Sequence, residues 1–243
     1  MKPTNQLVNP MLTDFYQITM AYAYWKAGVH EEKAVFDLFF RKNPFHGEFA
    51  IYAGLEEILR LCEHFHFSEE HVAYLKEQMP ECDPGFFDWL RGVDCSRMRI
   101  YAMKEGTVAF PLVPLMRVEG PIAIAQLLET PVLTLTNYPS LMTTNAAKYR
   151  LIVGFDKGLI EFGLRRAQGP DGGISASRYS FLGGLFCSPP TEEDQPTAGR
   201  IDSTPSGLRL IHFPGTASPP LVFPSRKAIM NPCSGGLWHF SSV

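Results

Sequence analysis

The 243-residue sequence has no long hydrophobic run and no excess of charge of one sign. No apolar stretch approaches the roughly 18 residues that a membrane-spanning helix needs, and the N-terminus lacks the hydrophobic segment of a secretory signal. Lys and Arg number 22 against 25 Asp and Glu, so the formal net charge is -3 and there is no basic field for nucleic acid. These absences predict a cytosolic protein without a membrane or nucleic-acid partner.

Cysteine is scarce and unpatterned. The five cysteines, at positions 62, 82, 95, 187 and 233, form no Cys-x-x-Cys pair, and their odd number argues against a disulfide framework. We therefore expect reduced thiols that behave as small hydrophobic side chains.

The motifs of common nucleotide-binding, hydrolytic and metal-dependent enzymes are missing as well. The chain contains no Gly-x-Gly-x-x-Gly, Walker A, Gly-x-Ser-x-Gly or His-Glu-x-x-His pattern. His64, His66 and His71 lie beside glutamates, but this segment spans the end of one expected helix and the cap of the next. One ion would be hard to satisfy with that spacing, so the sequence predicts no metal site.

Periodic hydrophobic segments fill the first 183 residues, and a hydrophobic content of 45% is enough for a core. The pattern predicts a helix that begins at Asp14, with Gln17 as its capping partner and with Phe15, Ile18, Tyr22 and Trp25 facing inward. Further helices are expected over 54–65, from Ser68, from Asp83 to Gly92, and over 122–135, 139–152 and 154–167. A β-rich segment at 34–40 and short strands between 97 and 119 complete an α+β fold class.

The character of the sequence changes at Gly183-Gly184. The stretch from Cys187 to Val243 contains nine prolines and little periodicity, and only 208–213 has the pattern of a strand. Such a segment buries too little apolar area to offset the entropy of ordering it. We therefore expect residues 185–243 to be disordered or loosely packed.

Three places carry side chains suited to ligand chemistry, and each has an alternative interpretation. Arg165 and Arg166 precede Gln-Gly-Pro-Asp-Gly-Gly, a pattern that fits anion binding as well as an ordinary helix end. Tyr16 could offer its ring face to a flat ligand or pack in the core beside Phe15. Arg41, with Lys42, could bind phosphate or mark a solvated strand end.

Several motifs, in order over about 180 residues, resemble the N-terminal part of the animal-type nicotinate phosphoribosyltransferases. The matching segments are Leu12-Thr13-Asp14-Phe15-Tyr16-Gln17-Ile18-Thr19-Met20, 36–41, 105–111, 126–131, 145–147, 163–173 and 179–184. The resemblance implies an N-terminal α+β domain over 1–138 and the start of an irregular α/β barrel over 139–184, before the divergent tail at 185–243.

The resemblance also implies a reaction. Nicotinate and phosphoribosyl pyrophosphate (PRPP) would give nicotinate mononucleotide and pyrophosphate for NAD salvage, with ATP hydrolysis coupled through a phosphohistidine, as in a ligase, and with Mg²⁺ present. By matching motif, Tyr16 would stack on the pyridine ring, with Asp14 in the same motif, while Arg41, Arg165 and Arg166 would contact phosphate groups. The active sites would form across a head-to-tail homodimer.

The sequence departs from the family pattern after Gly183-Gly184. The family's phosphohistidine lies in a Gly-Thr-(small)-Ala-His-Ser-Phe motif, whereas His212 and His239 lie in different surroundings, so no catalytic residue is carried over. Two alternatives follow: a non-catalytic truncated form that pairs with a full-length subunit, and a nicotinamide-using relative. Gln17 after Tyr16 and the Leu164-Arg165-Arg166 triplet favour the nicotinate form.

Overall fold

An antiparallel sheet of five strands forms one layer of the molecule. The computed structural model describes residues 2–187, 231–233 and 237–242. The sheet has the order β3-β5-β1-β9-β8, with β1 at Lys33–Leu38, β3 at Arg99–Ala102, β5 at Met116–Pro121, β8 at Asn231–Cys233 and β9 at Leu237–Ser242. In the β1–β5 register, Asp37 lies opposite Arg117, whose Nε donates to Asp37 Oδ1 at 2.9 Å. This cross-strand ion pair satisfies the buried Asp37 carboxylate.

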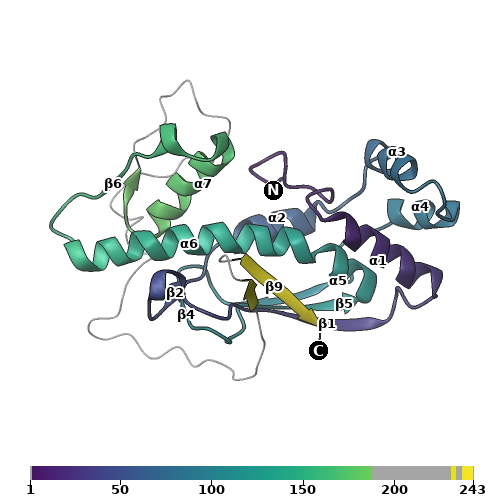
Figure 1. Cartoon of the computed structure of the whole chain (residues 1–243), viewed down its shortest axis with the longest axis horizontal. Coiled ribbons are helices and arrows are strands. Elements are labelled where there is room, and N and C mark those ends of the chain that lie inside the picture. Colours follow the sequence, from purple (N-terminus) through teal and green to yellow (C-terminus); the bar gives the residue numbers. More distant parts are fainter. Residues whose placement is uncertain (1, 188–230, 234–236, 243) are drawn as a thin grey trace.

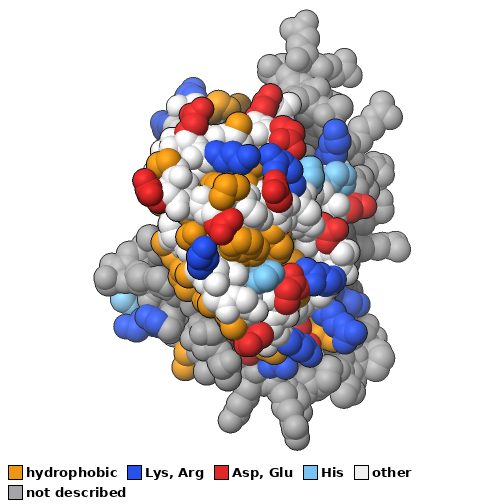
Figure 2. Space-filling model, turned by 90° about the vertical axis from the view of Figure 1, so that its right-hand side faces the viewer, with side chains coloured by type: hydrophobic (Ala, Val, Ile, Leu, Met, Phe, Trp, Pro, Cys, Tyr) orange, Lys and Arg blue, Asp and Glu red, His pale blue; other side chains and the backbone are white. Residues whose placement is uncertain are grey.

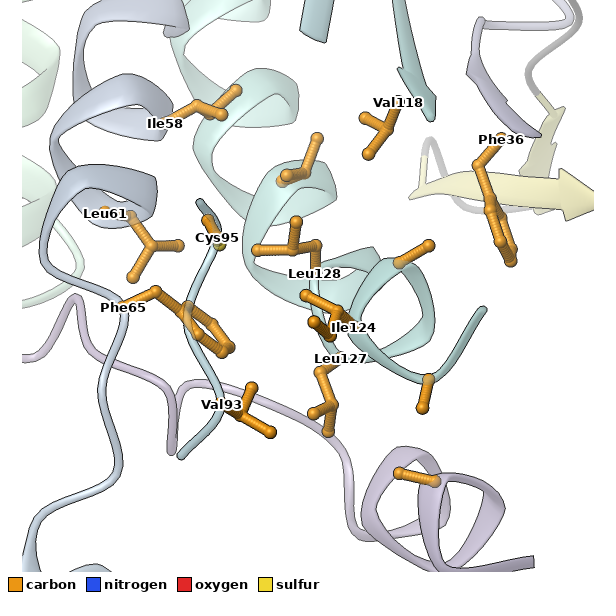
Figure 3. Packing of buried hydrophobic residues seen from close by; sticks show 14 of the residues in the cluster. Phe36, Ile58, Leu61, Phe65, Val93, Cys95, Val118, Ile124, Leu127 and Leu128 are labelled. Atoms are coloured by element: carbon orange, nitrogen blue, oxygen red, sulfur yellow. The ribbon is translucent and has the colours of Figure 1, made fainter. Parts of the chain in front are cut away.

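The core lies between this sheet and the helices. Leu38, Phe39 and Phe40 at the end of β1 are at most 1% exposed, and Val118 of β5 is completely buried. Figure 3 shows Ile124, Leu127 and Leu128 projecting into the same region as Ile58 and Leu61 of α2. The elements α1 (Phe15–Lys26), α2 (Leu55–Glu63) and α5 (Ile122–Leu127) supply these inward faces. Figure 2 shows that charges of both signs alternate around a hydrophobic area at the end of the molecule formed by α1, α3 and α4.

The starts of three helices confirm the expected caps. At α1 the Asp14 N–H donates to Gln17 Oε1 at 3.3 Å, and at α3 (Glu69–Gln78) the His71 N–H donates to Ser68 Oγ at 3.2 Å. The helix α4 (Pro84–Arg91) begins after Asp83 and is followed by Gly92, as expected. The prediction for the inward face of α1 is only partly confirmed, because Phe15 is exposed and Gln17 is buried instead.

A long helix replaces part of the expected pattern between 122 and 152. The sequence predicted a break near 136–138, but α6 runs from Glu129 to Val153 with Pro139 inside it. Tertiary contacts explain why the helix continues. Ser140 Oγ accepts the Ala53 N–H at 3.1 Å, and Thr144 Oγ1 accepts the Ile51 N–H at 2.8 Å. These bonds hold α6 against β2 (Ala50–Ile51), which pairs with β4 (Val108–Ala109), one of the short strands expected between 97 and 119.

The helix expected over 154–167 is wrong. Gly154 has φ 78° and ends α6, and the chain then forms the short strand β6 (Ile160–Glu161) and the 3₁₀ turn η2 (Leu164–Arg166). A helix missed in the sequence follows: α7 spans Gly169–Leu182, with Pro170 in its first turn and β7 (Phe186–Cys187) after it. Buried Arg150 holds the end of α6 to the segments that follow it, because its guanidinium donates to the carbonyls of Gly154, Lys157 and Gly184.

Two short segments of the Pro-rich tail form strands. Residues 231–233 and 237–242 form β8 and β9, and β9 pairs antiparallel with β1 from Phe36↔Ser242 to Leu38↔Phe240. The free edge of β1 offers unpaired backbone groups that such a strand satisfies, a non-local effect that local composition does not reveal. The strand pattern at 208–213 lies outside the described residues. No described helix is long and apolar enough to cross a membrane.

Candidate functional site

Tyr16 lies in the first turn of α1 with its ring half-exposed and its hydroxyl against a carboxylate. The ring is 44% exposed, and the hydroxyl hydrogen-bonds to Glu129 at the start of α6. Burial, followed by the hydrogen bond and charge of Glu129, raises the pKa of Tyr16 well above its usual value. The hydroxyl therefore stays protonated and serves as a donor. This arrangement fixes the ring and leaves one part of it open to a flat ligand.

Two buried glutamines, Gln17 and Gln126, connect the helix turn that carries Tyr16 to the start of α6. Gln17 is fully buried, and its Nε2 donates to the backbone carbonyl of Gln126. Gln126 Nε2 in turn donates to Glu129 Oε2 at 2.6 Å, so one chain of hydrogen bonds links the first turn of α1 to the start of α6. Asp14 joins the same corner by accepting a hydrogen bond from Thr130 Oγ1 at 3.1 Å. Networks of satisfied polar groups of this kind rigidify a site.

Arg41 lies in the exposed loop that follows β1. Phe45 and His46 in this loop have φ of 55° and 53°, in the left-handed region that costs energy for residues other than glycine. The loop also contacts α6, because Lys148 Nζ packs directly over Gly47, where a Cβ would lie only 2.0 Å from it. Arg41, Lys42 and Lys148 thus give this side of the molecule three cations near a strained turn.

Arg165 and Arg166 lie in η2, just before α7, rather than at the end of a helix. Both side chains are exposed. The turn packs closely on α7, because a Cβ on Gly173 would lie 2.4 Å from Leu164 Cδ1 and 3.2 Å from the Ala167 Cβ. The Tyr138 hydroxyl donates to the Gly172 carbonyl at 3.3 Å and ties the first turn of α7 to α6. Two arginines are therefore held next to a helix N-terminus, an arrangement suited to anions.

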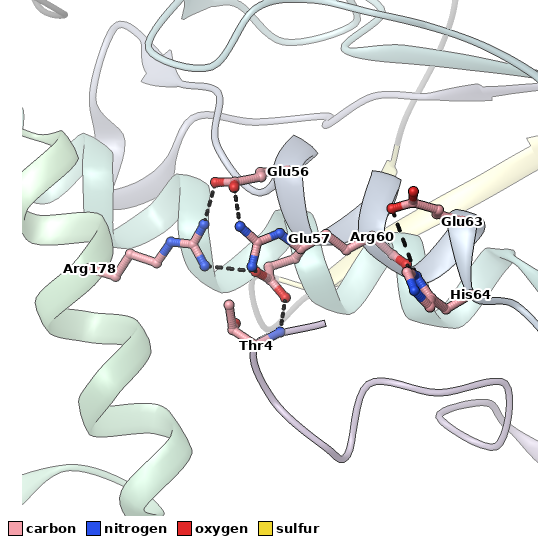
Figure 4. A network of polar contacts seen from close by, with 7 residues as sticks. All are labelled: Thr4, Glu56, Glu57, Arg60, Glu63, His64 and Arg178. Carbon is pink, nitrogen blue, oxygen red and sulfur yellow. Dashed lines mark hydrogen bonds and ion pairs between the residues drawn. The ribbon is translucent and has the colours of Figure 1, made fainter. Parts of the chain in front are cut away.

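A network of charged side chains joins α2 to α7 (Figure 4). Arg178 donates to Glu57 Oε1 at 2.8 Å and to Glu56 Oε2 at 2.6 Å, and the Thr4 N–H donates to Glu57 Oε2 at 3.0 Å. Burial acts to raise the pKa of Glu57, but the Thr4 and Arg178 hydrogen bonds outweigh it, so the pKa is lowered. Glu57 is therefore ionised and fully engaged in holding the two helices together.

The structure does not bring the expected site residues together within one chain. Figure 1 shows α1, which carries Tyr16, at one end of α6 and α7 at the other. A hollow of about 280 Å³ beside Arg97 and another of about 460 Å³ beside Cys62 are each lined by other residues than the expected site residues. Within the described ranges, no group of three His, Cys, Asp or Glu side chains is placed to hold a metal ion.

Sequence reasoning missed several residues that shape these places. Glu129 and Gln126 lie in a segment whose motif was recognised, but their contacts with α1 span more than 100 residues of chain and leave no local signal. Arg178 was missed with α7, although Pro170 followed by Asp171 is a typical helix start.

The comparisons with known proteins agree on one family. The model of the nicotinate phosphoribosyltransferase (NAPRTase) N-terminal domain matches residues 11–137. Nicotinate phosphoribosyltransferase 1 of Arabidopsis thaliana is 57% identical over 183 residues, covering 75% of this chain and 33% of the relative. Nicotinate phosphoribosyltransferase of Rattus norvegicus is 46% identical over 243 residues, covering 96% of this chain and 44% of the relative.

A solved structure gives the same result. The crystal structure of human nicotinic acid phosphoribosyltransferase matches with a TM-score of 0.67 and 52% identity, covering 71% of this chain and 35% of that one. The chain thus spans between a third and a half of the length of the relatives it matches. Tyr16, Asp14 and Arg41 lie within the matched family domain, whereas Arg165 and Arg166 lie beyond it.

Proposed function

The chain belongs to the nicotinate phosphoribosyltransferase family, and from that premise we propose that it takes part in forming nicotinate mononucleotide from nicotinate and PRPP. The observation that carries the proposal is the Tyr16 ring, held by Glu129 and half-exposed inside the matched domain. As in its relatives' family, ATP hydrolysis would be coupled to the transfer and Mg²⁺ would accompany PRPP.

In the proposed reaction, the pyridine nitrogen of nicotinate bonds to the anomeric carbon of PRPP while the bond from that carbon to the pyrophosphate oxygen breaks. The pyrophosphate leaves with the electron pair. Such a displacement needs the ring held in line and the departing charge neutralised. Tyr16 would orient the ring, and Arg41, Arg165 and Arg166 would contact phosphate oxygens. The described residues do not by themselves form a metal site, so no step of this chain is assigned through Mg²⁺ or ATP.

We place the complete site between two copies of the chain. Tyr16 contacts Glu129 in the first turn of α6, whereas the arginines of η2 precede α7, which packs on α6 from Tyr138 to Arg150. The two groups therefore lie beside different stretches of α6. A head-to-tail homodimer would bring Tyr16 of one copy to the arginines of the other.

Complementation between inactive variants tests this proposal. Pyrophosphate release is measured with nicotinate, PRPP, ATP and Mg²⁺ for the purified chain, for Tyr16→Ala and for Arg165→Ala. If the site is shared, mixing the two variants restores about a quarter of the wild-type activity, because half of the randomly formed dimers contain one intact site. No restoration would contradict the shared site.

Two other outcomes bear on the function itself. Turnover with nicotinamide but not with nicotinate would favour the nicotinamide-using relative. Binding of nicotinate or PRPP without turnover by the wild-type chain, together with co-elution with a full-length relative, would favour a non-catalytic subunit. Absence of both binding and turnover would contradict the proposal.

A further inference from the structure

Two cysteines far apart in the sequence meet at the edge of the core. Cys62 lies in the last turn of α2, one residue after buried Leu61, and Cys95 lies in the turn after α4, two residues after buried Val93. Figure 3 shows Cys95 beside α2, near Leu61. The two side chains interact with each other, and both line the same hollow.

The surroundings keep the pair in place and leave it reachable. The Cys95 turn is fixed by its own hydrogen bonds: Asp94 Oδ1 accepts the Ser96 N–H at 2.8 Å, and the Cys95 carbonyl accepts the Met98 N–H at 3.0 Å. Both cysteines line a hollow of about 460 Å³ whose apolar wall includes Leu59, Met98 and Ile100. Cys95 is 9% exposed, and Cys62 is half-buried, so a small reagent entering the hollow reaches Cys62 more easily.

The two thiols differ in acidity. The hydrogen bond from Cys95 outweighs the effect of burial and lowers the pKa of Cys62, whereas that bond and burial both raise the pKa of Cys95. The thiolate is the form of cysteine that reacts with oxidants and disulfides. Because Cys62 is also the more exposed of the two, it is the thiol placed to attack, and Cys95 is the thiol placed to resolve.

We propose that Cys62 and Cys95 form a redox-active pair, which hydroperoxides oxidise to a disulfide and thiol reductants restore. This modification site is independent of the proposed transferase reaction. The free thiols in the described structure represent its reduced form.

The oxidation balances in two steps. The Cys62 thiolate attacks one oxygen of hydrogen peroxide, the O–O bond breaks, and the released hydroxide takes up the proton lost by Cys62 to give water. The resulting sulfenic acid has an S–O bond, which breaks when the Cys95 sulfur attacks the Cys62 sulfur. The oxygen leaves as a second water with the Cys95 proton. Peroxide is reduced by two electrons, and the two thiols are oxidised to one disulfide.

The disulfide would restrict the movement of α2. It would close a loop that contains α3 and α4 and fix the C-terminal turn of α2 to the turn after α4. The opposite end of α2 carries Glu56 and Glu57, which hold Arg178 of α7. Oxidation therefore acts on the helix that joins α7 to the rest of the molecule.

Peptide mapping of the full chain tests the proposal. The reduced protein is treated with one equivalent of hydrogen peroxide, free thiols are alkylated, and the protein is digested without reductant. We expect a disulfide-linked pair of peptides that contain Cys62 and Cys95 and that separate on reduction. The same treatment in urea should scramble the linkage, because the pairing depends on the fold. The unfolding temperature of the oxidised protein should rise by several degrees.

Three variants separate the roles. In Cys95→Ser, Cys62 should accumulate as a sulfenic acid that dimedone labels, at a rate about tenfold above that of Cys82. In Cys62→Ser, Cys95 should stay reduced. Cys82→Ser is the matched control, because Cys82 has a raised pKa, and its removal should leave the 62–95 linkage unchanged. The wild-type map decides alone if a variant fails to fold: recovery of Cys62 and Cys95 as alkylated thiols while Cys82 is oxidised would overturn the proposal.

Discussion

At the scale of single residues, Tyr16 shows how a surface ring becomes a fixed one. A half-exposed tyrosine usually rotates, but the bond to Glu129 and the buried Gln17–Gln126 contact hold this part of the chain. The neighbouring Phe15 is also exposed but has no such anchor among the contacts of the described residues. The two side chains therefore form a natural pair for separating ring stacking from mere exposure.

Substitution of Tyr16 by Ala should weaken nicotinate binding about tenfold, because it removes a stacking surface worth on the order of 1–1.5 kcal/mol. Tyr16→Phe keeps the ring and should lose less. Phe15→Ala is the matched control and should bind as the wild type does. Isothermal titration with nicotinate measures all three, and equal losses for Tyr16→Ala and Phe15→Ala would argue against a stacking role.

The free energy of unfolding that Glu57 contributes should depend on pH. Its pKa is lowered in the folded state, so its contribution to stability is present above the unfolded value of about 4.3 and is lost as the pH falls through the folded pKa. Glu57→Gln should cost about 1–3 kcal/mol of unfolding free energy at pH 7 and less in acid.

The neighbouring Glu56 provides the control for that experiment. Its side chain is 47% exposed, against 6% for Glu57, although both contact Arg178. Glu56→Gln should cost less than about 1 kcal/mol because solvent screens an exposed pair. Urea unfolding at pH 7 and at pH 3.5 measures both variants. An equal loss for Glu57→Gln at the two pH values would show that its charge is not the source of the stability.

At the scale of elements, α6 and α7 pack closely because small residues line their contact. A Cβ on Gly183 would lie 2.6 Å from the Thr143 carbonyl oxygen and 2.4 Å from the Ala146 Cβ. Thr143 Oγ1 also donates across the contact to the Tyr179 carbonyl at 3.1 Å. The backbone of α6 cannot move away without losing this bond, so even one methyl group has no room.

Gly183→Ala should therefore destabilise the protein by about 1–3 kcal/mol. Gly172→Ala, in the first turns of α7, is the matched control, because its Cβ would meet only Gln168 Cβ at 4.0 Å, and it should be neutral or slightly stabilising. Thermal unfolding of the two variants gives the comparison. A neutral Gly183→Ala would mean that the α6–α7 contact is looser than the structure indicates.

The expected elements were right where their signals are local. The caps at Asp14, Ser68 and Asp83 act within three residues, so sequence identified the starts of three helices. The break expected between 135 and 139 is wrong, because hydroxyl contacts to β2 keep the helix continuous through Pro139. The strand β9 depends on the distant edge of β1, and no local pattern encodes such a partner.

At the scale of the whole molecule, the individual site residues could be chosen from motifs, but their arrangement could not. The similarity to known relatives placed Tyr16 and Asp14 in the matched domain, and the structure adds Glu129 as the group that holds the ring. The sequence predicted two shorter helices where the structure has the continuous α6, so the places of Tyr16 and Arg165 along this helix could not be predicted.

Large apolar side chains are exposed around the end of α6 and β6. Ile152 is 82% exposed and Phe162 is 75% exposed, with Phe155 and Ile160 nearby in the chain. Exposed apolar groups of this kind favour association. We expect the purified chain to self-associate at micromolar concentration, as measured by sedimentation velocity. Ile152→Lys with Phe162→Lys should reduce association, whereas Tyr74→Lys on α3, at the other end of the molecule, should not. A wild-type chain that sediments as a monomer would contradict this.

The proline inside α6 creates a point at which this helix can bend. Pro139 has no N–H to donate to the Leu135 carbonyl, so the helix is least stiff at that point. The arm from Pro139 to Val153 is about 21 Å long, so a bend of about 5° would displace its far end by about 2 Å. That end carries Arg150, whose guanidinium binds the carbonyls of Gly154 and Lys157, before α7, and of Gly184, after it. A bend at Pro139 would therefore move the segment after α7, which Arg150 holds through the Gly184 carbonyl.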